Sequence, residues 1–343
     1  MEGIGARPVW IRGEGVAAAC CAHLLDQAGM DALVDSAPRP KVPAIMLTGA
    51  TQHLLQDVFQ RNDIFADIPA IDKRIVAWGP GAQPVTLPHS AVVISEQALL
   101  DRIRPRLAGH ADLDAQEAGW RILTVRPLPT SSVERKFGSR IATASAVKLK
   151  PGHDAHACWI ESLENGWLFL LPLGEQSAWL LSVGGPLDEL LAGSRLVADQ
   201  IVEVDASPGK FPAHPRMADP LCGEGWLACG TAAVGFDPLC GDGTGNAVRE
   251  AILASAAVRA IADGADVSAV LAHYRARLLG GFKRHLEICH DFYSGGRCGD
   301  WWDREMAALK PGIEWSTQEL ADAPASRYRL NGFSLEALAS RSI

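Results

Sequence analysis

The chain has 343 residues, of which 48% are hydrophobic and 21% are charged. These proportions are typical of a folded globular protein and exclude a disordered or fibrous chain, and the length suits an α/β protein of two interleaved lobes. The formal net charge is −8, with acidic and basic residues mixed along the chain, which argues against a nucleic-acid partner.

The eight cysteines form no CxxC pair and show none of the regular spacing of a disulfide framework. Reduced thiols and a cytoplasmic location are therefore predicted. The first residues lack the charged region, apolar core and cleavage site of a signal peptide. No apolar run approaches the roughly 18 to 20 residues that a membrane helix needs, so we expect no membrane association.

A strand–loop–helix–strand pattern opens the chain. Residues 9–11 form a short apolar run, and Gly13 and Gly15 follow at once, as where a strand enters a tight turn. Residues 16–28 are rich in alanine and leucine and predict a helix, and residues 32–34 predict a second strand. These elements make a βαβ-like unit of about 30 residues.

The loop of this unit fits the pattern G-x-G-x-x-A, with Gly13, Gly15 and Ala18 at the fixed positions. Gly13 allows the turn, Gly15 lets the backbone approach a pyrophosphate, and Ala18 lets the helix pack closely on the strand. Free N–H groups at the helix N-terminus favour phosphate binding. The pattern therefore predicts a dinucleotide cofactor.

Asp35, at the end of the second predicted strand, is the candidate carboxylate for a ribose hydroxyl of that cofactor. The commonest spacing from the glycines falls one residue later, on Ser36, so both residues stay open as the ribose contact. A solvated acid at a strand end is the alternative reading of Asp35. Glu14 departs from the expected loop, because its carboxylate repels phosphate unless the side chain points outward.

The middle of the chain predicts a second lobe that is mostly β. Residues 52–60 predict a helix and residues 73–78 a strand. Residues 95–107 place apolar side chains on one helical face, with a serine as the N-cap. Residues 157–162 and 167–173 predict strands that are separated by turn residues.

A second glycine loop follows in the most informative segment of the chain. A predicted strand at residues 226–229 leads to Gly230 and Thr231, and then to Asp237 and Pro238. The residues that follow, and that we also assign to cofactor binding, are Gly241, Gly243, Thr244, Gly245 and Asn246, where a helix to about residue 262 begins. Closely spaced glycines let backbone N–H groups converge on one anion or carbonyl oxygen.

These segments resemble the FAD-dependent monooxygenases of the hydroxybenzoate-hydroxylase type and their relatives, the flavin-dependent halogenases. The matching positions are Gly13, Gly15, Ala18, Gly230, Asp237, Pro238, Gly241, Gly243 and Gly245. Thr231 departs from the family, in which an aspartate at that position contacts the ribityl chain of FAD. The departure implies that the flavin is held more weakly, or by Thr231 through a neutral hydrogen bond.

The resemblance implies FAD as the cofactor and an α/β fold: a Rossmann-type FAD-binding domain, a mostly β substrate lobe and C-terminal helices. We expect the FAD-binding domain at residues 1–50, 91–139 and 215–272, the substrate lobe at 51–90 and 140–214, and the helical region at 273–343.

The compact size and the loop FDPLCGDGTGN, residues 236–246, are most similar to one branch, the flavoprotein maturation factors of quinone-cofactor oxidases for lysine and glycine. That branch is implicated in oxidising a tryptophan side chain of a partner protein to build a tryptophylquinone. The resemblance implies hydroxylation of an oxidase precursor, with electrons from NAD(P)H or a separate flavin reductase. The alternatives are a small-molecule monooxygenase or halogenase, and a flavin-binding chaperone without turnover.

Few other residues are candidates for chemistry, as expected where a cofactor carries the difficult step. Lys73 is the nearest candidate for the lysine that activates hypohalous acid in halogenases, although its surroundings match poorly. Trp167, in a segment similar to the G-W-x-W-x-I-P strand of halogenases, and Trp301 and Trp302 are candidates for substrate contact or for core packing. No metal site is predicted, because the histidines and cysteine within residues 153–158 lack a fourth ligand.

Overall fold

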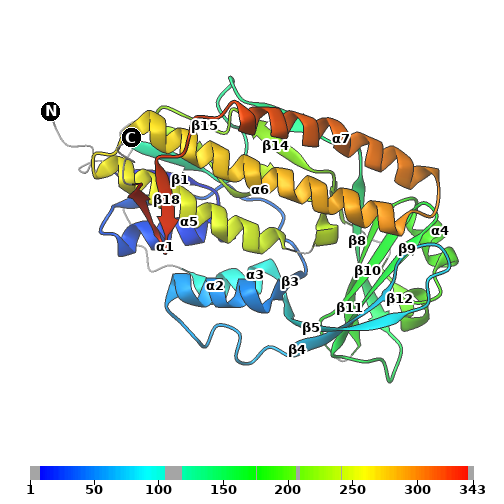
Figure 1. The fold of residues 1–343 in the computed structure, drawn as a ribbon. Helices are drawn as coiled ribbons and strands as arrows, with labels where there is room; N and C mark the ends of the chain where they lie inside the picture. The colour runs from blue at the N-terminus through cyan, green and yellow to red at the C-terminus, as the bar shows by residue number, and fades with distance from the viewer. Residues whose placement is uncertain (1–7, 105–117, 175, 206–208, 241, 339–343) are drawn as a thin grey trace.

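A computed structural model describes residues 8–104, 118–174, 176–205, 209–240 and 242–338. Two lobes lie side by side, and two long helices run along both of them (Figure 1). The helices are α1 (Val16–Gln27), α2 (Gly49–Phe59), α3 (Glu96–Ile103), α4 (Leu187–Gly193), α5 (Gly243–Ala262), α6 (Val267–Gly296) and α7 (Asp300–Ala321). No helix in the described part of the chain is long and apolar enough to cross a membrane.

The first lobe is built on a sheet with the strand order β15-β16-β6-β1-β2. Its strands are β1 (Val9–Arg12), β2 (Ala32–Asp35), β6 (Trp120–Leu123), β15 (Cys222–Gly223) and β16 (Trp226–Ala228). β1 pairs in parallel with β2 and with β6, and β16 pairs in parallel with β6. The helix α1 joins β1 to β2, as the N-terminal pattern predicted. This is the Rossmann-type unit.

The helices α1 and α5 pack against each other beside this sheet. Both are rich in alanine at the buried positions, among them Ala17 and Ala18 on α1 and Ala251 and Ala254 on α5. Small side chains let the two backbones come close. Since each helix begins at one of the two glycine loops, their packing brings together loops that are more than 200 residues apart in sequence.

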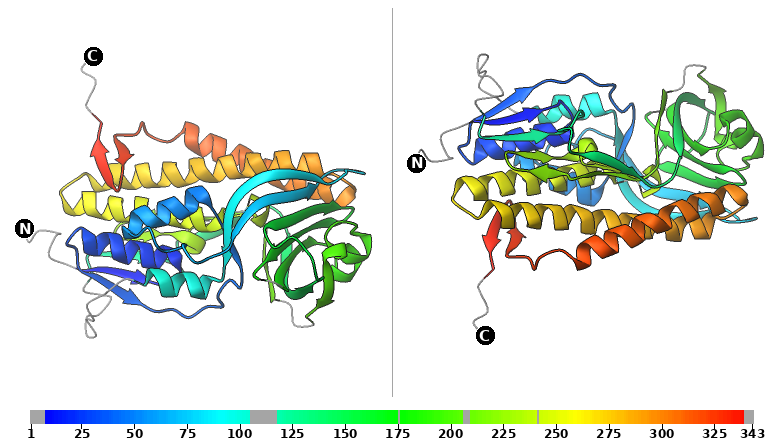
Figure 2. Two further views of the ribbon diagram at one scale, coloured as in Figure 1. Left: turned by 90° about the horizontal axis from the view of Figure 1, so that it is seen from below. Right: turned by 90° about the horizontal axis from the view of Figure 1, so that it is seen from above.

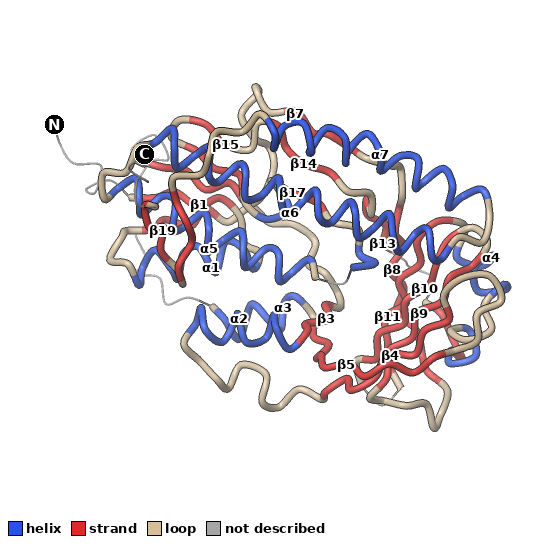
Figure 3. The backbone as a smooth tube through the Cα atoms, in the orientation of Figure 1, coloured by secondary structure: helices blue, strands red, loops and turns tan. Residues whose placement is uncertain are grey.

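The second lobe is a mixed sheet with the order β12-β8-β11-β10-β9-β4-β5-β3, and β13 also pairs with β8. Its strands are β3 (Ile45–Thr48), β4 (Ala70–Ala77), β5 (Val85–Ile94), β8 (Ile141–Leu149), β9 (Ala157–Leu163), β10 (Gly166–Pro172), β11 (Ser177–Gly184), β12 (Ile201–Val204) and β13 (Gly209–Pro212). The pairing of β4 with β9 is parallel, and the other pairs are antiparallel. The mostly β lobe that the sequence predicted is therefore present, gathered at one end of the molecule (Figure 3).

Smaller elements complete the chain. They are β7 (Val133–Lys136), β14 (Arg216–Asp219) and β17 (Val234–Gly235), which form a small sheet, the hairpin β18 (Tyr328–Asn331) and β19 (Ser334–Ala337), and the 3-10 turns at Ala198–Gln200, Gly230–Ala232 and Pro238–Cys240. The strand β19 packs on α5. The segment after residue 273 is therefore two long helices and a hairpin, where helices alone were expected.

The structure divides the chain near residue 50 differently from the expected boundaries. The strand β3 belongs to the sheet of the second lobe, through its pairing with β5. The helix α2 packs against α1 and α5 in the first lobe, although residues 51–90 were assigned to the substrate lobe. The cause is the apolar face of α2, which packs on the first lobe and buries Leu55 and Val58 fully.

The helix α6 is bonded to both lobes. Near its start, the Tyr274 hydroxyl donates to the Ala228 carbonyl on β16 at 2.6 Å. Near its end, the Tyr293 hydroxyl accepts from Trp167 Nε1 on β10 at 3.2 Å. Figure 2 shows α6 and α7 lying along both lobes in two further views.

Candidate cofactor and substrate site

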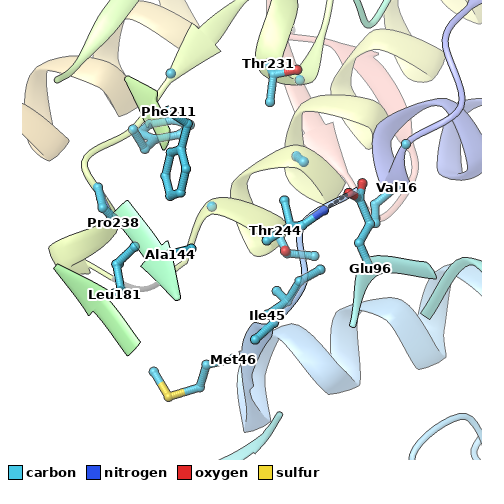
Figure 4. Close-up of a pocket in the computed structure, with 18 of the residues that line it drawn as sticks. Val16, Ile45, Met46, Glu96, Ala144, Leu181, Phe211, Thr231, Pro238 and Thr244 are labelled. Atoms are coloured by element: carbon cyan, nitrogen blue, oxygen red, sulfur yellow. Dashed lines mark hydrogen bonds between the residues drawn. The ribbon is translucent and has the colours of Figure 1, made fainter. Parts of the chain in front are cut away.

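A chamber of about 350 Å³ lies between the two lobes. Its polar end is formed by the start of α1, the 3-10 turn at Gly230–Ala232 and the start of α5, and its apolar end by the sheet of the second lobe. Figure 4 shows Val16, Glu96 and Thr231 on one side of this space, and Phe211 and Leu181 on the other.

The first glycine loop shapes the polar end. Gly13 has a φ of +127°, and a Cβ there would lie 2.1 Å from Thr124 Oγ1, so the position requires glycine. Gly15 lines the chamber as the N-cap of α1, whose first turn has neither a side-chain cap nor an acidic residue. Its N–H groups are therefore available to an anion. Ala18, fully buried, packs behind the loop.

Glu14, which departs from the loop pattern, forms hydrogen bonds with side chains outside the loop. Lys41 Nζ donates to its carboxylate at 2.7 Å and Ser36 Oγ at 2.9 Å. These hydrogen bonds, that of Lys41 first, lower the pKa of Glu14. Asp35 ends β2 and lies 3.9 Å from Arg12, and the residues that line the chamber do not include it.

Arg39 and Glu96 are functional candidates that the sequence did not reveal. Both line the polar end beside Gly15, and a Cβ on Gly15 would lie 2.7 Å from the Arg39 guanidinium. Arg39 binds the Glu96 carboxylate with both terminal nitrogens, and the Val42 amide donates to the same carboxylate at 2.8 Å. The pair places the Arg39 guanidinium, already bound to a carboxylate, beside the uncapped start of α1.

The second glycine loop meets the first one at Gly230. Gly230 has a φ of +60°, and a Cβ there would lie 2.9 Å from the Cβ of Ala17 in the first turn of α1. Thr231 is exposed to the chamber, and its hydroxyl donates to the Thr124 carbonyl at 3.5 Å. A side chain at Gly230 would therefore push the two glycine loops apart.

The start of α5 contributes Gly243 and Thr244 to the wall of the chamber. A Cβ on Gly243 would meet open space, whereas one on Gly245 would lie 2.1 Å from Asp242 Oδ1, so Gly245 serves packing. Asn246 accepts a hydrogen bond from Arg249 at 3.3 Å and is not among the lining residues. Gly241 lies outside the described residues.

Asp237 and Pro238 also line the chamber, and Asp237 is the centre of a buried polar network. Its Oδ2 lies 2.8 Å from Nε of Arg140, and the Tyr293 hydroxyl donates to the same oxygen at 2.9 Å. Its amide donates to His285 Nε2 at 2.9 Å. Burial and the Asp237 carboxylate raise the pKa of Tyr293, which keeps the hydroxyl protonated as a donor. The network fixes the backbone of the second glycine loop between Gly230 and Gly243.

Arg140 has a second anionic partner, Glu305 on α7, at 2.7 Å from Nη1, and its guanidinium lies 4.7 Å from the centre of the Tyr293 ring. The Arg140 side chain is fully buried. The network thus joins the residue before β8, the Asp237 turn, α6 and α7 in one set of polar contacts.

Glu250 is a further residue that the sequence analysis missed. It lies on α5, is 7% exposed, and lines the polar end of the chamber. Its Oε2 accepts a hydrogen bond from the Gly230 amide at 2.8 Å. Burial raises the pKa of Glu250 to about 8, against the lowering effect of that hydrogen bond.

The other candidates lie elsewhere. Lys73, on β4, pairs with Asp154 at 2.7 Å and does not line the chamber. Trp167 and Trp302 are fully buried, and Trp301 packs against Trp302 with ring centres 5.0 Å apart. The three tryptophans belong to the core between β10 and the long helices, and the lining residues do not include them.

The apolar end of the chamber comes from the second lobe. Its walls are aromatic and aliphatic side chains, among them Met46, Phe169, Trp179, Leu181 and Phe211. Within the described chain, the charged residues that line the chamber are Arg39, Glu96, Arg216, Asp237 and Glu250, and none of these five lies on a strand of the second-lobe sheet. The apolar end therefore suits an uncharged aromatic group.

The residues present fit FAD. Gly13, Gly15 and Gly230 are positions where a Cβ would meet a neighbouring side chain, so the two loops form a backbone cradle against the start of α1. Phosphate groups would lie on the α1 N–H groups beside Arg39, and the flavin end would reach the segment that includes Pro238 and Gly243.

Comparison with protein family models and with curated proteins finds no match for this sequence. Solved structures do match. The flavin-dependent halogenase CmlS superposes with a TM-score of 0.77 and 18% identity, over 96% of this chain and 84% of that chain. QhpG, a peptidyl tryptophan dihydroxylase essential for tryptophylquinone cofactor biogenesis, gives 0.69 and 17%, over 97% and 86%. The flavin-dependent brominase Bmp2 gives 0.64 and 15%, over 91% and 99%.

The chain therefore has the fold that flavin-dependent halogenases share with this tryptophan dihydroxylase. The fold class expected from the glycine motifs, a Rossmann-type unit with a mostly β second lobe and C-terminal helices, is confirmed.

Proposed function

We propose that the chain is an FAD-dependent monooxygenase that hydroxylates a tryptophan side chain of a partner protein during maturation of a tryptophylquinone cofactor. The observation that carries this proposal is the division of the chamber into a polar end of glycine turns and an apolar end that is uncharged throughout its described part. An indole ring matches that apolar end in its chemistry, because it is aromatic and neutral.

FAD, when bound and reduced, supplies the oxygen chemistry: one atom of O2 enters the ring and the other leaves as water, with two electrons from NAD(P)H directly or through a separate flavin reductase. The chain itself orients the substrate and excludes water. Phe169, Trp179 and Phe211 form the wall against which the indole packs. We place the reaction in the cytoplasm, where thiols such as Cys20 and Cys21 stay reduced.

The likeness of the fold to QhpG supports a substrate carried by a protein, since that protein acts on a peptidyl tryptophan. Phe211 is 40% exposed at the apolar end, and this exposed aromatic surface is open to contact with a partner. Remote contacts of a large substrate would orient the indole, so free tryptophan is expected to react poorly.

Co-expression with a quinone-cofactor oxidase precursor tests the proposal by mass spectrometry of the precursor. We expect oxygen to be added to a tryptophan only when this chain is present, and not with the Gly13→Ala variant as a matched control. Full modification without this chain, or rapid oxidation of free tryptophan, would contradict the proposal. Colourless wild-type protein that binds the precursor without modifying it would indicate a chaperone.

Halogenation of a small molecule is the second candidate, favoured by the fold likeness to CmlS. No lysine of the described chain lines the chamber, and Lys73 is engaged with Asp154. A bromide- or chloride-dependent product from small aromatic substrates would establish this candidate. Loss of that product in Lys73→Ala would restore Lys73 as its catalytic lysine.

A further inference from the structure

Glu250 occupies an unusual position for a glutamate. It is almost fully buried on α5, about two turns after Gly243 at the start of the helix, yet it lines the polar end of the chamber. Its hydrogen-bond donor is the Gly230 amide. Within the described residues it has no lysine, arginine or histidine as an ion-pair partner. A carboxylate buried in this way is unfavourable, while a neutral carboxylic acid is a hydrogen-bond donor.

The location of Glu250 determines what it faces. Gly230, which donates to it, packs against Ala17 in the first turn of α1. The start of α1 has no side-chain cap, and its N–H groups favour phosphate. Glu250 therefore lies at the junction of the two glycine loops, and its hydrogen-bond donor Gly230 directly precedes Thr231.

The groups around Glu250 supply no positive charge that would balance an ionised Glu250 carboxylate. Cys229, at the end of β16, and Tyr274, from α6, interact with it electrostatically. The pKa of Cys229 is raised well above its ordinary value by its hydrogen bond with Cys21 and by burial, and burial does the same for Tyr274. Cys20, the adjacent thiol on α1, also has its pKa raised by burial. All three groups with a raised pKa are neutral near pH 7.

The cations of the chamber are paired with other acids. Arg39 binds Glu96, and Arg216 lies 3.3 Å from Glu134. Both therefore have a carboxylate partner other than Glu250. Since burial raises its pKa to about 8, Glu250 is protonated over most of the physiological range.

We propose that Glu250 is a cofactor-binding residue of this chain, whose neutral carboxylic acid donates a hydrogen bond to an oxygen of the ribityl–pyrophosphate part of FAD. The contact would come from α5, which packs beside the uncapped start of α1. An ionised carboxylate at the same place would repel the pyrophosphate. This inference rests on FAD binding alone and does not depend on the identity of the substrate.

The test is the dissociation constant of FAD for the apoprotein, measured by quenching of flavin fluorescence from pH 6 to 9.5. In the wild type we expect a constant value below about pH 8 and a rise approaching tenfold for each pH unit above it, as one proton is linked to binding. Glu250→Gln keeps an N–H donor and an acceptor for Gly230 and does not titrate, so its profile should be flat. Glu250→Ala should bind at least about tenfold more weakly at pH 7.

Melting curves by circular dichroism at each pH identify variants that fail to fold. Of the two Glu250 variants, Glu250→Gln should disturb folding less, because it keeps the size of the side chain and the acceptor for Gly230. Lys73→Ala, outside the chamber, is the matched control and should follow the wild type. A flat wild-type profile, or a Glu250→Gln profile that rises with pH like the wild type, would overturn the inference. Wild-type protein that binds no FAD at any pH would overturn the cofactor assignment as well, whereas failure of the tryptophan test leaves this measurement unchanged.

Discussion

Replacing Arg140 by methionine should both destabilise the protein and loosen its hold on FAD. Arg140 is fully buried, with Asp237 at 2.8 Å and Glu305 at 2.7 Å. Methionine fills part of the volume but leaves two carboxylates without their cation. Breaking a buried pair from one side costs about 3 to 5 kcal/mol, and the lost contact with the Tyr293 ring adds about 0.5 to 2 kcal/mol.

Thermal melting by circular dichroism measures this loss, and we expect a fall in melting temperature of about 5 °C or more. The affinity for FAD should fall too, because Asp237 holds the turn between Gly230 and Gly243 within the second glycine loop. A triple variant with Arg140→Met, Asp237→Asn and Glu305→Gln removes all three of these buried charges and should recover most of the stability. Arg61→Met, which removes an exposed pair with Asp63, is the control and should melt like the wild type. An Arg140→Met protein with an unchanged melting temperature would refute the reasoning.

Two further predictions concern the polar end. Gly13→Ala should abolish FAD binding in equilibrium titration while the second lobe stays folded. Gly13 has a φ of +127°, and a Cβ there would lie 2.1 Å from Thr124 Oγ1, so a methyl group has no room. Tight FAD binding by this variant would contradict the assignment of the two glycine loops to the cofactor. For the apoprotein, the pKa of Glu250 is raised to about 8, so wild-type stability falls as pH rises from about 4.5 to 8, by up to about 1.4 kcal/mol per unit. Glu250→Gln should lack this decline in urea unfolding, and equal slopes would refute it.

The parts of the site that the sequence predicted are those set by local backbone chemistry. Gly13 and Gly15 follow β1 and precede α1 because a tight turn between a buried strand and a helix requires glycine. The same holds for Gly230, whose φ of +60° favours glycine at the turn of the second glycine loop. Such positions depend on neighbours within a few residues, so the sequence reveals them.

Arg140 and Glu250 could not be recognised in the same way. The partners of Arg140 follow it by 97 and 165 residues, on elements that meet only in the folded chain. Glu250 lies in a correctly predicted helix, where an acid is ordinarily exposed, and its hydrogen-bond partner Gly230 is 20 residues earlier in the chain. Tryptophans likewise reveal apolar burial but not which surface they face: Trp179 lines the chamber, whereas Trp301 and Trp302 pack in the core.

The helix α6 limits how the molecule can move. Its 30 residues extend for about 45 Å without a proline, with Tyr274 bonded to β16 and Tyr293 to Trp167 on β10. A hinge between the lobes would have to bend this helix and break its internal hydrogen bonds, or release one of those tyrosines. The distance between the cradle and the apolar wall is therefore set by one continuous helix that is hydrogen-bonded to both lobes. A new substrate range can then arise by replacing side chains of the second lobe while the cofactor keeps its position.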